Sequence, residues 1–207
     1  RGTKKWEVPY LPIDPADVGR KYEPVVRINS QSGKGGVAFI MENIYGYKLP
    51  KEMQREFADV IQKISEKEGG EVEPVVIMAA FRKEYLDCKA PFEYCKAKVN
   101  EHSALHDDVV VELDFKYMGH EYHSEAEGNG PIDAAMIAIK QCVGAVDVAV
   151  INYTEHALSE GSHAKAAAYI QMRDKRTGRM TFGVGGSSNI TRASIKAVFS
   201  ALNRLLR

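Results

Sequence analysis

Apolar and polar residues follow two different periods along this chain, and the change of period divides it. Within residues 50–68, apolar side chains recur at three- and four-residue steps, which forms one apolar stripe along a helix. From about residue 89 the period becomes two. Between residues 109 and 117, Val and Leu or aromatic residues alternate with mostly charged ones, which is typical of a half-buried strand. We therefore expect a helical part followed by a part that mixes strands and helices.

Local signals place the ends of the helices in the first part. The helices are expected over residues 36–45, 50–68 and 75–86. Pro50 suits the first turn of the second helix, where a missing N–H costs nothing, and Gly69 and Gly70 end that helix. Residues 1–20 contain three prolines that forbid a continuous helix. They are expected to form an extended arm.

The second part repeats one order of elements, three strands followed by a helix. The expected elements are strands over 92–101, 109–117 and 121–127, a helix over 131–143, strands over 146–153, 164–172 and 180–184, and a helix over 189–206. Met118, Gly119 and His120 are expected to form the turn of a hairpin. A duplicated βββα unit can pair its two sheets face to face. The sequence thus predicts an α+β fold, with a small, mainly helical linker subdomain in residues 1–88 and two βββα units in residues 89–207.

Composition excludes several classes of function. The chain has 207 residues, of which 28 are basic and 28 acidic, and zero net charge argues against a nucleic-acid surface. No run approaches about 18 apolar residues, so we expect no membrane span, and the first residues lack the apolar core of a signal peptide. Three widely spaced cysteines indicate reduced thiols and a cytoplasmic protein. The missing initiator Met suggests a piece of a longer chain.

The glycine-rich segment Asn29–Gly36 looks like a phosphate-binding loop but lacks the required spacing. Such a loop needs Gly-Lys-Ser/Thr preceded by a glycine at a fixed distance. Here Gly35 follows Lys34, and no glycine stands at that distance before Gly33. We expect a polar hinge in which Gly33, Gly35 and Gly36 supply the conformational freedom.

The turn Gly128-Asn129-Gly130-Pro131 is the best candidate for a binding site. Pro131 suits the first position of a helix, and Asn129 or Gly130 suits its cap. Glycines on both sides of Asn129 let a ligand approach the backbone, and the free N–H groups of a helix start favour an anion such as a carboxylate. The alternative is a tight strand-to-helix turn that binds nothing. The second helix start, at Ser187–Ile190, has the same two interpretations.

Small residues alternate on one later strand, at Ala164, Ala166 and Ala168. They leave room either for close packing of a helix or for the floor of a pocket that takes a small branched side chain. Ile132, Ile151 and Leu158 could form the apolar walls of such a pocket.

Other chemistry finds little support in the sequence. The six histidines form no helical His-x3-His motif and no paired-cysteine motif accompanies them, so we expect no metal site. No Gly-x-Ser-x-Gly motif occurs, and no self-contained catalytic apparatus is recognisable. Tyr22 lies among charged residues and is either an anchor, a substrate contact or a general acid.

Four segments carry a family resemblance that covers nearly the whole chain. They are WEVPYLPIDP from Trp6, RINSQSGKGGVA from Arg27, YTEHAL from Tyr153, and Gly183-Val184-Gly185 followed by NITRAS from Asn189. With these segments the chain resembles the C-terminal part of 2-isopropylmalate synthases of the actinobacterial and fungal type. Those enzymes condense acetyl-CoA with 2-oxoisovalerate, the first committed step of leucine synthesis. Their catalytic domain is a TIM barrel that holds a divalent metal.

The resemblance implies that this chain is the linker plus the leucine-sensing regulatory domain, without the barrel and therefore inactive alone. It implies a homodimer in which leucine binds between two regulatory domains and inhibits the enzyme. The residues that match the effector site are Gly128, Asn129, Gly130, Ile132, Asp133, Ile151, Thr154, Leu158, Ala164, Ala166, Ser188 and Ile190. Thr154 and Ser188 depart from the residues common in relatives, an aromatic residue and a proline. Tyr22 matches a linker tyrosine implicated in transmitting the leucine signal.

Leucine also suits the residues. Helix starts can hold its carboxylate, Asp133 or loop carbonyls its ammonium group, and the alanines with Ile132 its isobutyl group. Two alternatives remain. The chain is a dimerisation scaffold that senses nothing, or it is the regulatory region of a citramalate or homocitrate synthase. No cofactor, nucleic acid or membrane is expected as a partner of this chain.

Overall fold

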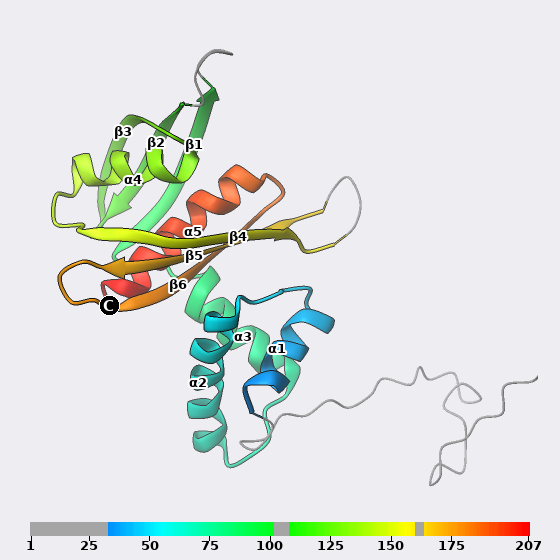
Figure 1. Ribbon diagram of the computed structural model, residues 1–207. Coiled ribbons are helices and arrows are strands. Elements are labelled where there is room, and N and C mark those ends of the chain that lie inside the picture. Colours follow the sequence, from blue (N-terminus) through cyan, green and yellow to red (C-terminus); the bar gives the residue numbers. More distant parts are fainter. Residues whose placement is uncertain (1–32, 102–107, 160–163) are drawn as a thin grey trace, which may run out of the picture.

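The computed structural model describes residues 33–101, 108–159 and 164–207 (Figure 1). Its elements are α1 (Gly33–Asn43), α2 (Lys51–Glu68), α3 (Pro74–Phe81), the π-helical turn η2 (Arg82–Leu86), β1 (Phe92–Glu101), β2 (Val109–Tyr117), β3 (His120–Gly128), α4 (Pro131–Cys142), β4 (Val148–Ala157), β5 (Ala166–Asp174), β6 (Met180–Ser187) and α5 (Ile190–Leu205). The strands form two antiparallel sheets, β1-β2-β3 and β4-β5-β6. The predicted α+β fold with two βββα units is confirmed.

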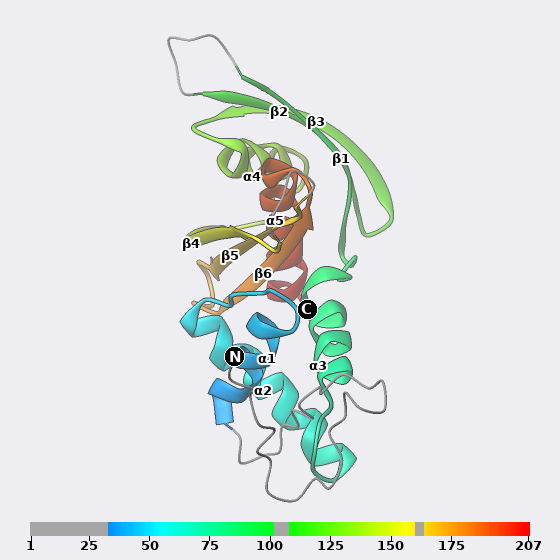
Figure 2. The ribbon, with the colours of Figure 1, turned by 90° about the vertical axis from the view of Figure 1, so that its right-hand side faces the viewer.

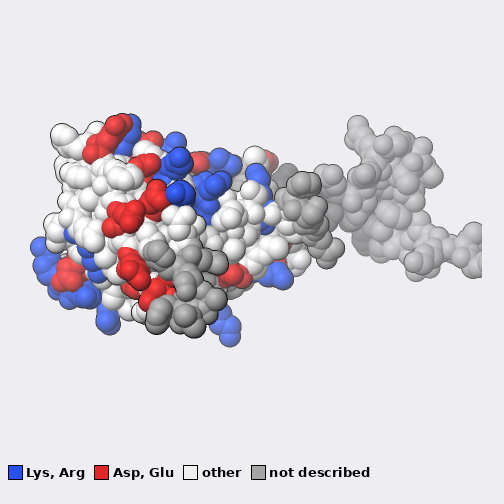
Figure 3. All heavy atoms as spheres, turned by 90° about the horizontal axis from the view of Figure 1, so that it is seen from above, with Lys and Arg blue, Asp and Glu red and all other residues white. Residues whose placement is uncertain are grey.

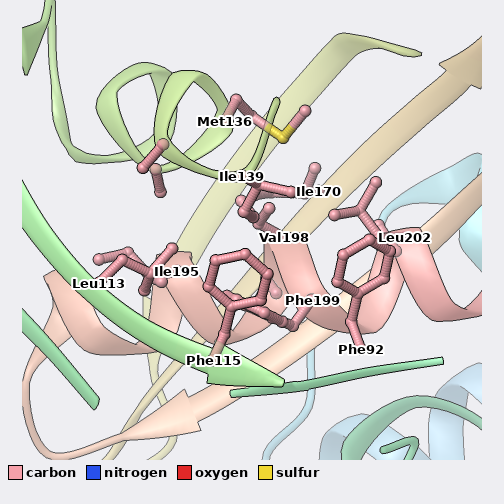
Figure 4. Packing of buried hydrophobic residues seen from close by; sticks show 14 of the residues in the cluster. Phe92, Leu113, Phe115, Met136, Ile139, Ile170, Ile195, Val198, Phe199 and Leu202 are labelled. Atoms are coloured by element: carbon pink, nitrogen blue, oxygen red, sulfur yellow. The ribbon is translucent and has the colours of Figure 1, made fainter. Parts of the chain in front are cut away.

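The two sheets do not pack face to face, and that expectation is wrong. Figure 2 shows the layers in order: the β1–β3 sheet, then α4 and α5, then the β4–β6 sheet, then the helical module α1–α3. One apolar core joins side chains of both sheets to both middle helices, including Phe115 on β2, Ile139 on α4, Ile170 on β5 and Phe199 on α5 (Figure 4). The helices fill the middle because their own apolar faces must also be buried.

Strand β5 is buried on both of its faces, which explains its almost continuous apolar sequence. Ala168 and Ile170 face the core with α4 and α5, while Ala167 and Tyr169 face the helical module. Successive side chains of a strand point to opposite faces, so this division follows directly from the period of two. The small residues that suggested a pocket floor therefore include Ala168, which packs in the core.

Helix α5 lies unusually close to β6 because glycine occupies two positions there. A Cβ atom on Gly183 would stand 2.1 Å from the backbone nitrogen of Ala201, and one on Gly185 would stand 1.9 Å from the backbone oxygen of Ala193. Neither position can carry a side chain without moving the helix backbone. The alternating glycines thus set the distance between helix and sheet.

The helical module packs on the outer face of the β4–β6 sheet through an aromatic cluster. Phe57 of α2, Phe81 of α3 and Tyr85 of η2 are fully buried, with ring centroids 5.2–5.8 Å apart. Gly69 ends α2 in the left-handed conformation (φ 82°), as predicted. The expected helix over 75–86 instead runs as α3 and then widens into the π-helical turn η2, to which the buried Tyr85 belongs.

Three predicted boundaries differ from the structure in an informative way. The first hairpin has a two-residue loop, Met118 (φ 49°) and Gly119 (φ 83°), so His120 already belongs to β3 and pairs with Tyr117. Strand β4 extends to Ala157 because it pairs along its length with β5. Helix α1 begins at Gly33, three residues before the expected start, so the proposed hinge glycines form its first turn.

Candidate functional site

The start of α4 is built from a glycine on each side of Asn129. Gly130 is the N-cap residue, in an extended conformation, and Pro131 is the first helical residue. Gly128 needs to be glycine, because a Cβ atom there would lie 2.6 Å from the backbone nitrogen of Ala134. The Asp133 carboxylate reaches back to accept the backbone N–H of Asn129 at 3.1 Å. The helix start therefore already carries a carboxylate of its own, which suits the positive end of the helix dipole and can also pair with a cationic ligand group.

A cavity of about 480 Å³ opens at this helix start, between α4 and the beginning of β4. It is lined by Asn129, Gly130, Pro131, Ile132, Asp133, Met136, Lys140, Val148, Ala149, Val150 and Lys175. The lining combines one carboxylate, two ammonium groups and an apolar wall, and a mainly apolar lining with a few polar groups is typical of small-molecule sites. Lys140 donates to the backbone oxygen of Val148 at 3.4 Å, and Lys175 pairs with Asp147 at 3.5 Å.

The structure brings four of the predicted site residues together here, namely Asn129, Gly130, Ile132 and Asp133. Sequence reasoning missed Met136 and Lys140, although helical spacing could have found them. Residues four and eight positions after Ile132 lie on the same face of a helix. No local pattern points to Lys175, which reaches the cavity from the turn between β5 and β6.

Other predicted site residues lie at the far end of the second sheet. Val148 pairs with Asp174 at one end of β4, and Ala157 pairs with Ala166 at the other, roughly 30 Å away at the usual rise per residue. Leu158 packs against the helical module. Its neighbours at that end are Ala164, Ala166 and Ser188, of which Ser188 is exposed. One chain by itself therefore does not gather the whole predicted site.

The start of α5 has its own cavity, of about 510 Å³. Asn189 caps this helix by accepting the backbone N–H of Arg192 at 2.9 Å, and Ile190 follows with 36% of its surface exposed. The cavity is lined by Ala97, Val99, Asn100, Asn189, Thr191, Arg192 and Ile195. It shares no residue with the cavity at the α4 start, so the two helix starts do not open into one cleft within a single chain.

Strand β4 is an edge strand that is exposed on both faces from Val150 to Glu155. Three of these residues are large and apolar: Val150, Ile151 and Tyr153 are 38%, 44% and 37% exposed. The predicted site residue Thr154 is also exposed. The pairing of β4 with β5 shifts register at Ile151, but the strand carries neither lysine nor proline, the residues that often prevent pairing at an edge. Its exposed apolar side chains indicate an association surface.

Several further predictions concern charge, metal and membrane. In the described part of the chain, no group of three His, Cys, Asp or Glu side chains lies close enough to hold a metal ion. None of the helices in the described ranges has the length and apolar character of a membrane span. Acidic and basic side chains are interspersed on the face drawn in Figure 3. Tyr22, the arm and the first part of the glycine-rich segment lie outside the described residues.

Comparisons with known proteins identify the family. Residues 71–206 match the family model described as "LeuA allosteric (dimerisation) domain", and residues 1–42 match "Alpha-isopropylmalate synthase, post-catalytic domain-like". Similar relatives include proteins named 2-isopropylmalate synthase. The protein of Corynebacterium efficiens is 45% identical over 204 residues, which cover 99% of this chain and 34% of the relative. The protein of Mycobacterium leprae is 46% identical, over 97% of this chain and 32% of the relative. The protein of Pseudomonas putida is 44% identical, over 98% of this chain and 35% of the relative.

This chain thus spans about one third of the length of the curated relatives it matches. The family model that covers more than half of it includes all of β1–α5 described above. The chain therefore belongs to the family of LeuA allosteric (dimerisation) domains.

Proposed function

We propose that this chain is the regulatory and dimerisation portion of a 2-isopropylmalate synthase and that it binds leucine for feedback inhibition. The names of the relatives support the enzyme, and their greater length is consistent with a catalytic barrel, holding the divalent metal, outside the residues of this chain. The chain by itself is then inactive. The observation that carries the proposal is the cavity at the α4 start, which combines one carboxylate, two ammonium groups and an apolar wall.

An aliphatic amino acid matches these three features. Its ammonium group pairs with Asp133, beside the start of α4, and its carboxylate pairs with Lys140 or Lys175. Its isobutyl group packs on Ile132 and Met136, where burial supplies about 2 kcal/mol. This arrangement differs from the sequence-based expectation, in which the helix N–H groups held the carboxylate. The reason is that Asp133 already occupies the helix start.

A second copy of the chain, docked on β4, would complete the site. In a two-fold dimer the same strand of both copies meets itself in opposite directions. The beginning of β4 in one copy then lies near the end of β4 in the other. Such an arrangement brings the α4 start of one copy toward Leu158, Ala164, Ala166 and Ser188 of the other, with Ile151 and Thr154 along the contact. In this dimer, the predicted site residues from the two ends of β4 would lie together at the interface between the copies.

Inhibition requires that leucine bind one conformation better than another. The first turn of α1, with Gly33, Gly35 and Gly36, is the proposed hinge, because glycine tolerates large changes of backbone dihedral angle. Tyr22 is the proposed relay toward the catalytic barrel. Both roles concern the full-length enzyme.

Calorimetry with leucine tests the effector. We expect saturable heat with leucine and at least tenfold weaker binding in Asp133→Asn, whose amide oxygen can still accept the N–H of Asn129. Asp59→Asn, on the exposed surface of α2, is the matched control and should bind normally. No heat with leucine, together with clear heat for isoleucine or lysine, would reject leucine as the effector.

Gly130→Val separates sensing from a purely structural role. A Cβ atom at Gly130 meets nothing within 4 Å, and the residue lines the cavity, so a larger side chain narrows the cavity without a clash. Lost leucine binding with intact dimers supports sensing. Lost dimers without any effect on leucine binding support the scaffold alternative.

Ile151→Glu tests the docking surface. A charge in the middle of the apolar stretch of β4 should convert dimers to monomers in sedimentation experiments, while Met118→Glu, at the 70% exposed tip of the first hairpin, should not. Dimers that persist in Ile151→Glu would place the interface elsewhere.

A further inference from the structure

A third cleft lies at the seam between the helical module and the β4–β6 sheet. Its volume is about 510 Å³, within the range of small-molecule sites. Tyr47 lines it from the loop after α1, Tyr94 from β1, Gly186 from β6 and Lys196 from α5. It shares no residue with the cavity at the α4 start, and only Leu158 is common to this cleft and to the residues that a second copy would add to the proposed leucine site.

Positive charge dominates the lining. Four cations, Arg82, Lys89, Lys165 and Lys196, face one carboxylate, Asp87. That carboxylate is already paired with Arg82, whose Nε lies 3.2 Å from it. The three lysines form no ion pair with any carboxylate in the described parts of the chain. The cleft therefore presents three ammonium groups whose charge the surrounding residues do not neutralise.

Lys196 is the least exposed of the three lysines. Burial lowers the pKa of its ammonium group, and the positive charges of Arg192 and Lys165 lower it further. Its Nζ lies 5.8 Å from the centre of the Tyr94 ring. This cation–π contact stabilises the ammonium group less than a bound anion would. An anion in the cleft would relieve the repulsion among these cations.

The edge of β6 adds a hydrogen-bond donor. The outward N–H of Phe182 donates to the Glu56 carboxylate at 3.2 Å, and that of Val184 donates to the Ser200 hydroxyl at 3.0 Å. Outward N–H groups recur every second residue along an edge strand, so the next belongs to Gly186, which lines the cleft. A Cβ atom on Gly186 would meet nothing within 4 Å, so the space beside it is open. The same edge already binds a carboxylate at Phe182.

We propose that this cleft binds a small metabolite through an oxyanion, either a phosphate or a carboxylate. The oxyanion accepts hydrogen bonds from Lys165, Lys196 and the N–H of Gly186, and Tyr94 and Phe199 border the rest of the ligand. The lining comes from the helical module and from the domain of two βββα units. A bound anion thus bridges the two and favours the closed seam between them.

Nuclear magnetic resonance titration of the whole chain tests this site. The probes are inorganic phosphate, pyrophosphate and malonate, each at constant ionic strength set with potassium chloride. We expect the amide signal of Gly186 to shift and to saturate with at least one probe. Lys196→Gln should weaken that binding at least tenfold, while Lys63→Gln, an exposed lysine on α2, should leave it within twofold. The probe that binds most tightly identifies the oxyanion.

Two results would overturn the proposal. One is a shift that never saturates with any probe, and the other is equal weakening by Lys196→Gln and Lys63→Gln, which indicates nonspecific screening. Asp133→Asn should bind phosphate normally, because Asp133 is not part of this cleft. Failure of the leucine proposal and failure of this one are therefore distinguishable.

Discussion

The guanidinium group of Arg204 on α5 forms a buried ion pair with the carboxylate of Glu56 on α2. Arg204 also donates to Glu84 on η2 at 3.0 Å and to the backbone oxygen of Phe182 on β6 at 2.6 Å. Its guanidinium lies 4.1 Å from the centre of the Tyr85 ring. Glu56 in turn accepts from Tyr85 and from the N–H of Phe182. One charged network thus ties the helical module to the domain of two βββα units.

Removing Arg204 from this network should destabilise the protein strongly. The Arg204 side chain is only 8% exposed, so Arg204→Met keeps the apolar volume but leaves Glu56 without its cation. We expect the free energy of unfolding to fall by about 3 kcal/mol, the low end for a broken buried pair, because Glu56 keeps 25% exposure. Urea denaturation measures the loss.

Arg55→Met is the matched control, since Arg55 is exposed on the same helix as Glu56. Its effect should stay within about 0.5 kcal/mol. A double variant, Glu56→Gln with Arg204→Met, should cost less than the sum of the two single changes because the partners are coupled. Equal losses for the Arg204 and Arg55 variants would show that the ion pair contributes nothing.

The close contact between α5 and β6 predicts opposite outcomes for neighbouring glycines. Gly185→Ala places a Cβ atom 1.9 Å from the backbone oxygen of Ala193, so the helix must move. We expect the free energy of unfolding to fall by about 1–3 kcal/mol. Gly186→Ala, one residue on, meets nothing within 4 Å and should change stability little. Thermal unfolding should therefore show a lower melting temperature for Gly185→Ala than for Gly186→Ala. Similar melting temperatures would contradict the tight packing described here.

The proton affinity of His123 should depend on its partner across the hairpin. Asp114 lies directly opposite on β2, with its carboxylate 2.6 Å from Nδ1. This hydrogen bond, and then the charge of Asp114, raise the pKa of His123 above its usual value. A pKa raised by folding stabilises the protein below the unfolded pKa, and that contribution disappears as the pH rises through the folded pKa.

Asp114→Asn should therefore lower the pKa of His123 toward its usual value in a magnetic resonance titration. Asp59→Asn, far away on α2, should not change it. If His123 titrates identically in the wild type and in Asp114→Asn, the pair is absent in solution.

Local patterns were sufficient for most elements and insufficient for the buried polar contacts. The stripe on α2 and the alternation on β2 each reflect one buried face, so a short window of sequence identifies them. Arg204 and Asn203 are also buried, yet both are polar, and no window of α5 indicates what they bind. Phe92, which Asn203 binds, and Glu56, which Arg204 binds, lie more than 100 residues away, so only the folded chain reveals why polar residues stand there.

The same limit applies to the candidate site. The turn at Gly128–Pro131 follows from backbone chemistry, and a cavity is lined by Asn129, Gly130 and Pro131 of this turn. Lys175 joins that cavity only through the turn between β5 and β6. Leu158, Ala164 and Ala166 lie at the other end of β4, because the register between β4 and β5 places them there. A single sequence carries no information on which ends of two copies meet.

Asn203 offers the sharpest test of a buried polar contact. It is fully buried on α5, where its side-chain oxygen accepts the backbone N–H of Phe92 at 2.7 Å. Its amide nitrogen donates to the backbone oxygens of Phe92 at 2.7 Å and Cys88 at 2.8 Å. The side chain thus holds the segment between η2 and β1 against the helix.

Asn203→Leu should lower the free energy of unfolding in urea by at least about 2 kcal/mol, because it removes the partner of two buried backbone groups of Phe92 and of the partly buried oxygen of Cys88. Asn152→Leu, on exposed β4, is the control and should change little. Asn203→Asp should be damaging as well, since a carboxylate still accepts the N–H of Phe92 but repels both carbonyl oxygens. Hydrogen exchange at the Phe92 amide should then be faster in Asn203→Leu than in the wild type, while exchange at the centre of β2 changes less. Unchanged exchange at Phe92 would mean that the segment is held by apolar packing alone, with no role for the amide.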